Sequence, residues 1–364
     1  MKLTFKKDAA LQCLTPLQSV IGAKTMLPIL AHVVFEVSEG KVWVIGSDLE
    51  MWITCHFPAQ VEGKGSITIP GRRLFSVIRE LPGQEAVMEV QDDGATVIRS
   101  QRSYFRMLGL SKDEFPGRPD LANAVEVSIQ QKELARLVRQ TSYASAQDDD
   151  RRTLSGILFS FAKGILTTVA TDGRRLSLAQ ADCEMPADLA NEVILPLKTV
   201  VELAKILKEE GDIKIVLGSH QVAFITPSVQ IFSRQLEGRF PGYQQVIPAV
   251  SRLKIVIPRE EFMAVVKRVS LLTSENSPSV KFSFESGKVE VSTITPEVGE
   301  AREELNIAYD GSSAEIAFNP HFINDVLKNL EEDEMSLELN DSNSPGVIRT
   351  DGKFLAIIMP IKLA

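Results

Sequence analysis

The chain has 364 residues, of which 44% are hydrophobic and 24% are charged, and its mean hydropathy is +0.02. This composition is that of a folded globular protein and excludes a collagen-like, coiled-coil or largely disordered chain, while the length exceeds one ordinary core of ~100–150 residues. The net charge of −8 and the pI of about 5.3 argue against a nucleic-acid partner, unless the positive charge is gathered on one part of the surface.

Neither end of the sequence has the pattern of an export signal or a membrane helix. Lysines near the start are not followed by the apolar run of a secretory signal, and the apolar stretch 354–361 is far shorter than the ~20 residues of a membrane helix. Cys13, Cys55 and Cys183 are odd in number and widely spaced, which favours neither a disulfide framework nor a metal-binding pair. We expect a cytoplasmic protein with no membrane contact, no metal and no cofactor.

Helical and strand patterns alternate along the chain in a fixed order. A helical pattern, two half-buried strand patterns joined by a turn, and a second helical pattern form a series that occurs three times. The helical patterns of the three series cover 6–22 and 70–81, 130–146 and 196–210, and 258–274 and 319–333. Pro16 lies inside the first pattern, so we expect that helix to kink or to end early.

The three series keep a constant spacing. The turn glycines and one strand phenylalanine of each series are 124 and 123 residues apart: Gly40, Gly164 and Gly287, and Phe35, Phe159 and Phe282. Glycine suits such a turn because it adopts a positive φ without a Cβ clash. Agreement at several positions indicates duplication, so we predict three copies of one α+β domain, over 1–120, 121–248 and 249–364.

Positive charge is concentrated in the six helical segments. Counted over 5–22, 70–81, 129–146, 196–208, 257–274 and 319–330, they carry a net charge of +8, so the rest of the chain carries −16. If these helices share one side of the molecule, an acidic protein offers a basic surface to one partner. Attraction to phosphates is local, because salt screens charges over ~10 Å, and the net charge of −8 therefore does not exclude nucleic acid.

Four motifs and the threefold repeat resemble the bacterial sliding clamp family, the β subunit of DNA polymerase III. The motifs are SDLEM at 47–51, TVATDGRRL at 168–176, EGRFPGY at 237–243 and IMPIKL near the end. The resemblance covers the whole chain and implies a non-catalytic processivity factor. It implies a head-to-tail homodimer that closes into a ring of six clamp-type domains, with helices on the inner face, antiparallel sheets outside and duplex DNA through the hole. Binding of DNA is then independent of sequence, because phosphate contacts carry no sequence information.

The resemblance also assigns residues that contact DNA. The positions that match the family's contacts are Lys24, Arg72, Arg152 and Thr153, and we add Arg151 and Lys198 for their chemistry. Aromatic side chains commonly occupy the family positions of Arg152 and Thr153, so stacking on a base is lost here. The neighbouring Asp148–Asp150 would repel the phosphate backbone.

A crevice between the second and third domains is the family's partner site. It takes short peptides rich in Gln, Leu and Phe from the polymerase III catalytic subunit, the clamp loader, other polymerases and repair proteins. The matching residues are Leu154, Thr171, Gly173, Arg174, Arg175, Leu176, Pro241, Val246, Asn319, Phe322, Ile357, Met359, Pro360 and Ile361. Arg174 stands where histidine is common, and Ser277 stands where a bulky or basic rim residue occurs. The dimer contact matches Phe105 and Met107 in the first domain and Leu271 and Leu272 in the third.

One alternative belongs to a different class, a metal-dependent phosphoesterase that would use Asp148–Asp150 and Asp172. Adjacent carboxylates on a loop point in different directions, and no histidine lies nearby in the sequence. Asp172 also repeats Asp48 at a spacing of 124 residues, which favours a turn-forming aspartate over a catalytic one. A loading or anti-mutator variant of the clamp, with altered partners, cannot be separated from the clamp by sequence.

Overall fold

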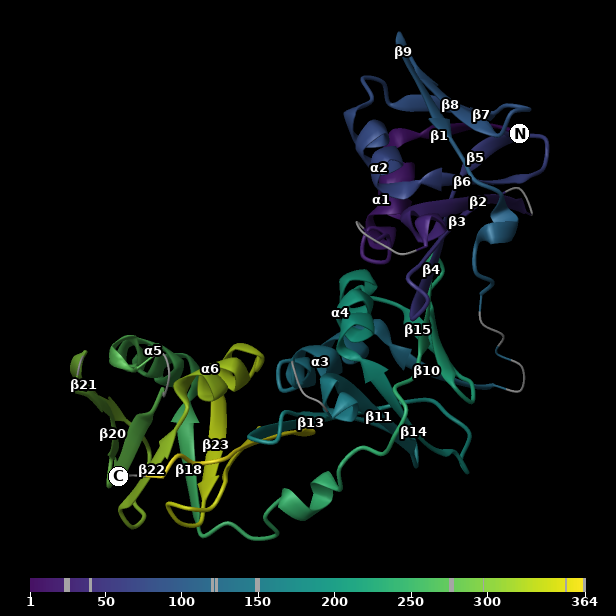
Figure 1. Cartoon of the computed structure of the whole chain (residues 1–364). Coiled ribbons are helices and arrows are strands. Elements are labelled where there is room, and N and C mark those ends of the chain that lie inside the picture. Colours follow the sequence, from purple (N-terminus) through teal and green to yellow (C-terminus); the bar gives the residue numbers. More distant parts are fainter. Residues whose placement is uncertain are drawn as a thin grey trace. The chain divides into compact units, whose positions relative to one another are not determined.

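The computed structural model describes residues 1–22, 27–38, 41–118, 121, 124–147, 151–274, 278–296, 298–350 and 352–362. The chain forms two compact units, which are described separately (Figure 1). Unit 1 contains Met1–Lys132 and Lys198–Gln235, and unit 2 contains Glu133–Leu197 and Leu236–Ala364.

Six α-helices appear in the described residues, one in each predicted helical segment and shorter than the pattern. They are α1 (Lys7–Leu17), α2 (Gly71–Glu80), α3 (Gln131–Ser142), α4 (Leu197–Ile206), α5 (Arg259–Val269) and α6 (Pro320–Lys328). The prediction for Pro16 is confirmed, because α1 ends at Leu17, directly after this proline. None of the helices in the described part of the chain is long and apolar enough to cross a membrane.

Unit 1 contains an eight-stranded and a five-stranded sheet, both antiparallel. The larger sheet has the order β10-β15-β16-β17-β4-β3-β2-β6 and the smaller β5-β1-β7-β8-β9. The strands of the first domain are β1 (Lys2–Lys6), β2 (His32–Ser38), β3 (Lys41–Ser47), β4 (Met51–Phe57), β5 (Ala59–Glu62), β6 (Ser66–Pro70), β7 (Glu85–Val90), β8 (Ala95–Ser100) and β9 (Ser103–Leu108). The others are β10 (Val125–Gln130), β15 (Asp212–Leu217), β16 (Gln221–Ile225) and β17 (Val229–Arg234).

Unit 2 repeats this arrangement with an eight-stranded and a four-stranded antiparallel sheet. Their orders are β14-β11-β12-β13-β25-β24-β23-β18 and β21-β20-β19-β22. The strands from the central part of the chain are β11 (Gly156–Ala162), β12 (Ile165–Thr171), β13 (Arg175–Asp182) and β14 (Ala190–Pro196). The later ones are β18 (Leu253–Pro258), β19 (Val280–Glu285), β20 (Lys288–Thr295), β21 (Gly299–Asn306), β22 (Ala314–Phe318), β23 (Glu334–Leu339), β24 (Gly346–Arg349) and β25 (Phe354–Ile358).

Each eight-stranded sheet joins strands from two neighbouring repeats. In unit 1, β17 pairs with β4, with Ile231 opposite Ile53. In unit 2, β25 pairs with β13, with Ala356 opposite Ser177. The strands of the central repeat are therefore shared between two continuous sheets, and the two compact units divide within that repeat. The domain boundaries near 120 and 248 stay predictions.

The repeated residues have repeated structural roles. Phe35, Phe159 and Phe282 are all buried in the core. Gly164 and Gly287 have φ angles of +77° and +79° at the β11–β12 and β19–β20 hairpins, the left-handed conformation that favours glycine. Gly40 lies outside the described residues.

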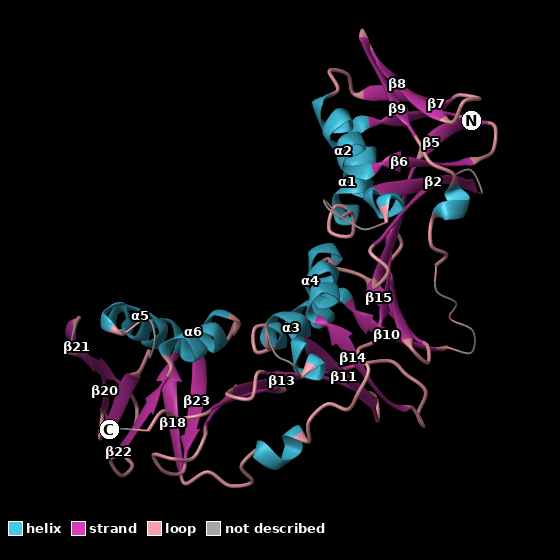
Figure 2. Cartoon of the chain, viewed as in Figure 1, coloured by secondary structure: helices cyan, strands magenta, loops and turns pink. Residues whose placement is uncertain are grey.

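Within each unit, a pair of helices packs against one face of the strands. Figure 2 shows α1 beside α2 in unit 1, and α5 beside α6 in unit 2. The α5–α6 pair covers β20, β21 and β25, with Phe262 of α5 packed on Phe282 of β19 at a ring separation of 5.6 Å. The linkers between the repeats pack against the opposite face of each large sheet.

Candidate functional site

A cavity of about 180 Å³ lies in unit 2, where the turn between β12 and β13 meets the end of β25 and a short 3-10 helix, Tyr243–Val246. Ten of the predicted pocket residues line it: Leu154, Thr171, Gly173, Arg174, Arg175, Leu176, Pro241, Val246, Ile357 and Met359. The sequence prediction thus collected residues from positions more than 200 apart that share one cavity.

The turn at one wall of this cavity is shaped by Asp172. Its Oδ1 accepts hydrogen bonds from the backbone N–H groups of Arg174 at 2.9 Å and Arg175 at 3.0 Å, and Gly173 has a φ of +85°. In the first repeat, Asp48 Oδ1 accepts from the N–H groups of Glu50 and Met51 in the same way. An aspartate that closes a turn twice has a structural role here.

Arg175 ties this turn to α6. Its side chain is 12% exposed, donates from Nε to Asp172 at 3.1 Å and from Nη1 to Asp325 at 2.6 Å, and donates from Nη2 to the carbonyl oxygen of Tyr143 at 2.7 Å. Its guanidinium also lies 4.5 Å from the centre of the Phe322 ring, a cation–π distance. These contacts satisfy the buried charge and fix the wall of the cavity.

Tyr143 and Ser177 extend this network into the protein. The Tyr143 hydroxyl donates to Ser177 Oγ at 3.0 Å, and Ser177 donates to the carbonyl oxygen of Gln140 at 2.6 Å. Burial raises the pKa of Tyr143 well above its usual value, because the charged phenolate would lose its hydration. The phenol therefore stays a neutral donor at physiological pH.

The floor of the cavity is apolar and its rim is exposed. Leu154, Leu176 and Ile357 are 1%, 4% and 2% exposed, whereas Val246 and Met359 are 49% and 43% exposed. Met359 is held in place by its backbone N–H, which donates to the carbonyl oxygen of Arg174 at 2.9 Å. An apolar floor with a flexible methionine at its rim accommodates varied apolar side chains.

Four predicted pocket residues lie outside the lining and support it. Asn319 caps α6 by accepting from the N–H of His321, and Phe322 packs under Arg175. The N–H of Ile361 donates to the carbonyl oxygen of Ala317 at 2.8 Å, so this bond and the Met359 bond flank Pro360. The cavity is also lined by Gly242 and Tyr243, which belong to the GRFPGY motif and were not among the predicted pocket residues, and by Arg151, which we predict to contact DNA.

Replacing Arg175 with methionine should destabilise the protein by about 2–4 kcal/mol, because it leaves Asp172 and Asp325 without their cation. Urea denaturation followed by circular dichroism would measure this loss. Arg174 is the matched control, since its side chain is exposed, and Arg174→Met should change stability by less than ~0.5 kcal/mol. Equal effects of the two substitutions would contradict the role assigned to Arg175.

The residues predicted to contact DNA differ in how they are held. Arg72 donates from Nε and Nη2 to the carbonyl oxygen of Ile21 at 3.1 and 3.0 Å, and Lys198 pairs with Asp48. Arg152 and Thr153 belong to the 3-10 helix Arg152–Ser155, where Arg152 is exposed. Lys24 and Asp148–Asp150 lie outside the described residues.

The residues predicted at the dimer contact lie beside two edge strands. Phe105 and Met107 belong to β9, the last strand of the five-stranded sheet in unit 1. Leu271 and Leu272 form a 3-10 turn that packs against β20 and β21, and β21 is the edge of the four-stranded sheet in unit 2. Leu271 is 75% exposed.

No three His, Cys, Asp or Glu side chains are grouped as metal ligands in the part of the chain that the structure describes. Asp172 makes its hydrogen bonds to the β12–β13 turn. The remaining residues of the phosphoesterase alternative, Asp148–Asp150, are outside that part.

Comparison with known proteins covers the whole chain. Family models of the DNA polymerase III beta subunit match its N-terminal domain to residues 1–119, its central domain to 128–242 and its C-terminal domain to 244–362. The beta sliding clamp of Chlamydia pneumoniae is 34% identical over 100% of this chain and 99% of its own, and that of Pseudomonas putida is 29% identical over 100% of both.

Solved structures agree with the sequence comparisons. The DNA polymerase sliding clamp of Bacillus subtilis has a TM-score of 0.96 and 30% identity, with both chains covered completely. The Pseudomonas aeruginosa sliding clamp bound to griselimycin has the same score, identity and coverage. These matches support the non-catalytic processivity clamp and not the phosphoesterase, and the chain belongs to the DNA polymerase III beta subunit family, the bacterial beta sliding clamps.

Proposed function

We propose that two copies of this chain join head to tail into a closed ring around duplex DNA. The ring has three clamp domains from each chain, over 1–120, 121–248 and 249–364, with the helices lining the hole and the sheets outside. The observation that carries this proposal is that β9 in unit 1 and β21 in unit 2 each lie at an edge of their sheet in the part of the chain that the structure describes.

β9 and β21 correspond to strands that pair with each other twice within the chain, between neighbouring repeats. β17 pairs with β4, and β25 pairs with β13. By position in the repeat, β9 corresponds to β17 and β25, and β21 corresponds to β4 and β13. A third pairing of the same kind joins β9 of one chain to β21 of another. Such a contact uses two different surfaces, and it forms a ring when its rotation closes.

The repeats also give the register of this third pairing. In the β8–β9 hairpin Ala95 pairs with Leu108, and 126 residues later Gln221 pairs with Arg234 in the β16–β17 hairpin. Phe105 of β9 therefore corresponds to Ile231 of β17. In the same way, Thr168 pairs with Ala179 in β12 and β13, and Val291 pairs with Glu303 in β20 and β21. Ser177 of β13 therefore corresponds to Ala301 of β21. The observed pairs Ile231–Ile53 and Ser177–Ala356 then place Phe105 opposite Ala301, Arg106 opposite Glu300 and Tyr104 opposite Arg302.

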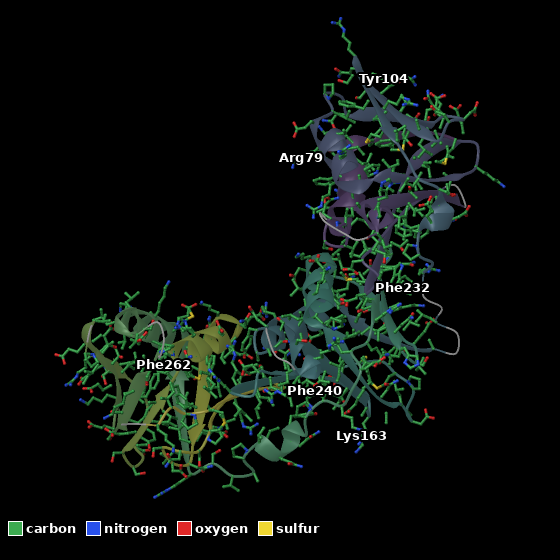
Figure 3. The ribbon with its side chains drawn as sticks, in the orientation of Figure 1. Arg79, Tyr104, Lys163, Phe232, Phe240 and Phe262 are labelled. Atoms are coloured by element: carbon green, nitrogen blue, oxygen red, sulfur yellow. The ribbon has the colours of Figure 1, made fainter. Side chains whose placement is uncertain are left out.

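The side chains at these edges are complementary. The segment 99–108 carries Arg99, Arg102 and Arg106 and no acidic residue, whereas β21 carries Glu300, Glu303 and Glu304 beside one arginine. Exposed apolar side chains flank both strands: Tyr104 and Leu108 are 56% and 66% exposed, and Leu271 and Ile294 are 75% and 76% exposed. Figure 3 labels Tyr104 on β9. Opposite charge around apolar area favours association of unlike surfaces.

The cations of the helices then face the phosphates of the threaded duplex. The ranges 5–22, 70–81, 129–146, 196–208, 257–274 and 319–330, which contain the helices, carry a net +8 in each chain. We assign DNA contacts to Lys24, Arg72, Arg151, Arg152, Thr153 and Lys198. The bonds of Arg72 to a carbonyl oxygen and of Lys198 to Asp48 orient these side chains and leave N–H groups for phosphate. Contacts of this kind position DNA without reading its sequence, which suits sliding.

We assign the 180 Å³ cavity to short partner peptides rich in Gln, Leu and Phe. The partners are the polymerase III catalytic subunit, the clamp loader, other polymerases and repair proteins. The apolar floor would take the Leu and Phe side chains, and Thr171 with the backbone around Gly173 would orient the peptide. The exposed guanidinium of Arg174 at the wall favours a peptide with an acidic residue over a basic one.

Retention on circular DNA tests the ring. The clamp, loaded by its clamp loader onto a nicked circular duplex, should remain bound through gel filtration at a salt concentration that abolishes binding to linear DNA. Cutting the circle once should release it, because only topology then holds the protein. Release at the same rate from circular and linear DNA would contradict the ring.

A further inference from the structure

Strand β18 (Leu253–Pro258) has one edge without a partner strand in the part of the chain that the structure describes. It is the last strand of the eight-stranded sheet in unit 2 and pairs with β23 alone. In the first repeat the equivalent strand, β1, pairs with β7 on one side and with β5 (Ala59–Glu62) on the other. The third repeat therefore leaves open an edge that the first repeat covers with a strand of its own.

The first helix of each repeat fixes which residues of β1 and β18 correspond. The N–H of Lys7, the first residue of α1, donates to the carbonyl oxygen of Gln84 at 2.8 Å. The N–H of Arg259, the first residue of α5, donates to the carbonyl oxygen of Asp333 at the same distance of 2.8 Å. Each residue of β18 thus stands 252 positions after its counterpart in β1, as Arg259 stands after Lys7.

The backbone groups of Lys254 and Val256 point to the open edge. Residues of an antiparallel strand direct their N–H and C=O groups alternately to one side and to the other. Arg259 bonds on the side of β23, so Ile257 and Ile255 direct their groups to that side as well. The two residues that alternate with them direct theirs away from β23.

β5 shows how a strand fills such an edge. It runs antiparallel to β1, with Gln60 opposite Thr4 and Glu62 opposite Lys2, and Lys2 Nζ pairs with the Glu62 carboxylate at 2.8 Å. The counterpart of Lys2 in β18 is Lys254, which is exposed. A strand added to β18 in the same way meets a cation at the same place.

The segment of this chain that could cover β18 is held elsewhere. β5 comes from the residues between β4 and β6, and the third repeat has residues 307–313 between the corresponding strands, β21 and β22. The N–H of Ile307 donates to the carbonyl oxygen of Gly287 at 3.0 Å, and the N–H of Gly287 donates to that of Tyr309 at 2.7 Å. These bonds tie the segment to the β19–β20 turn, so a strand on β18 comes from another chain.

A cavity of about 420 Å³ continues the open edge. It lies between the start of β18 and the start of β22, which are neighbours in unit 2 (Figure 1), and its lining includes Leu253, Ile316 and Ser312. An added antiparallel strand that passes Lys254 enters this cavity, because its next residues stand opposite Leu253 and Arg252. The volume lies within the ~300–1,000 Å³ of typical binding sites.

Two cations select the charge of the partner. Arg252, directly before β18, and Lys254 are both exposed and, two residues apart, share one face of the strand. The carboxylate across the strand pair from Lys254 is that of Glu338, which Arg349 already holds at 3.2 Å. Two cations at this edge repel the same edge of a second copy and attract acidic residues opposite them.

The carboxylates that line the cavity are already held by other groups. Glu315 pairs with Lys281 at 2.7 Å, and Asp341 Oδ1 accepts from the N–H groups of Asn343 and Ser344, each at 2.8 Å. These bonds offset the negative charge of both carboxylates, so the lining does not exclude an acidic strand.

We propose that the open edge of β18 binds an extended acidic segment of a partner protein, which adds to the sheet as an antiparallel strand. Its backbone bonds to Lys254 and Val256, an apolar side chain packs on Val256, which is 39% exposed, and acidic side chains stand opposite Lys254 and Arg252. Main-chain hydrogen bonds supply the affinity of such an added strand, and alternate side chains supply its specificity. This edge shares no residue with the 180 Å³ cavity.

Fluorescence anisotropy of the labelled peptide Ala-Ile-Val-Glu-Ser-Glu with the full-length protein tests the proposal. The first four residues follow β5, with Ile in place of Gln because Val256 stands where Thr4 does. We expect one peptide to bind per chain. Methylating the backbone nitrogen of Ile, which points to β18, should weaken binding at least about tenfold, and methylating that of Val, which points away, less than about threefold. Equal effects of the two methyl groups, or no saturable binding at about 1 mM peptide, would overturn the proposal.

Substitutions locate the peptide. Val256→Pro removes an N–H that points to the open edge and keeps the bonds to β23, so it should weaken the peptide at least about tenfold while the circular dichroism spectrum stays unchanged. Lys254→Glu should weaken it about fivefold, and Ala-Ile-Val-Lys-Ser-Glu should restore the affinity of this variant. Lys163→Glu is the matched control, since Lys163 is an exposed lysine at the β11–β12 turn (Figure 3).

Two other occupants have outcomes of their own. Competition with a Leu- and Phe-rich polymerase tail peptide would move the acidic peptide to the 180 Å³ cavity. A smaller molecular mass of the unliganded Val256→Pro variant in analytical ultracentrifugation would assign the edge to a second copy of the chain. Either result, or unchanged affinity in both Val256→Pro and Lys254→Glu, would contradict a site for a partner protein on β18.

Discussion

Cysteines introduced at Tyr104 and Arg302 should cross-link two chains into a covalent dimer when the protein is oxidised. In the register proposed for β9 and β21 these residues stand directly opposite each other, where Cβ atoms are about 4.5–5.5 Å apart, within reach of a disulfide. The three native cysteines are buried, so they do not compete. Non-reducing gel electrophoresis measures the yield.

The control pair is Tyr104→Cys with Glu304→Cys. Arg302 and Glu304 are two residues apart on β21 and therefore share a face of the strand, but Glu304 would be a diagonal neighbour of Tyr104 at about 7–8 Å, too far for an unstrained disulfide. Similar yields from both pairs would refute the register, and no cross-link from either would refute the pairing.

Deleting Met359–Ala364 should weaken the binding of a Leu- and Phe-rich polymerase tail peptide by about 100-fold or more, while the dimer stays intact. The deletion removes Met359 from the rim and the backbone bonds of Met359 to Arg174 and of Ile361 to Ala317. Losing several well-packed contacts at such a site makes the free energy of peptide binding less favourable by about 3 kcal/mol. Fluorescence anisotropy of the labelled peptide measures affinity, and analytical ultracentrifugation measures the dimer.

A point substitution separates the methionine from the backbone bonds. Met359→Ala keeps both hydrogen bonds and should weaken the peptide about tenfold, through lost apolar contact alone. Val250→Ala is the control, because Val250 is 78% exposed and does not line the cavity. Unchanged affinity in both the deletion and Met359→Ala would remove the peptide from this cavity.

The local structure followed from the sequence because its signals are local. Apolar spacing marked all six helices, and Pro16 ended α1 as expected. Phe35, Phe159 and Phe282, whose spacing indicated the repeat, are all buried in the core. The matched aspartates Asp48 and Asp172 predicted equivalent turns. The family, and with it the processivity function, was predicted from four motifs and the repeat.

Ten of the predicted pocket residues line the cavity in unit 2, but the contacts that hold its wall could not be read from the sequence. Neighbouring arginines at 174 and 175 look alike in the sequence, yet Arg174 is exposed while the half-buried Arg175 lies between two carboxylates and a phenylalanine ring. Which of them reaches Asp325 depends on where α6 packs, and Asp325 lies 150 residues beyond Arg175 in the chain. Tyr243 was missed for the same reason, since its place depends on how the second linker folds back over the sheet.

The helices, the hairpins, the threefold repeat and the family could all be predicted from the amino-acid sequence. These depend on periodicity within about 20 residues or on spacing between copies, and both can be counted along the chain. Three features could be read only from the folded chain: the pairing of β17 with β4 and of β25 with β13, the position of β9 and β21 at sheet edges among the described residues, and the contact of Arg175 with Asp325. Strand pairing and burial depend on residues distant in the chain, and no local pattern encodes which distant edge or linker a given residue meets.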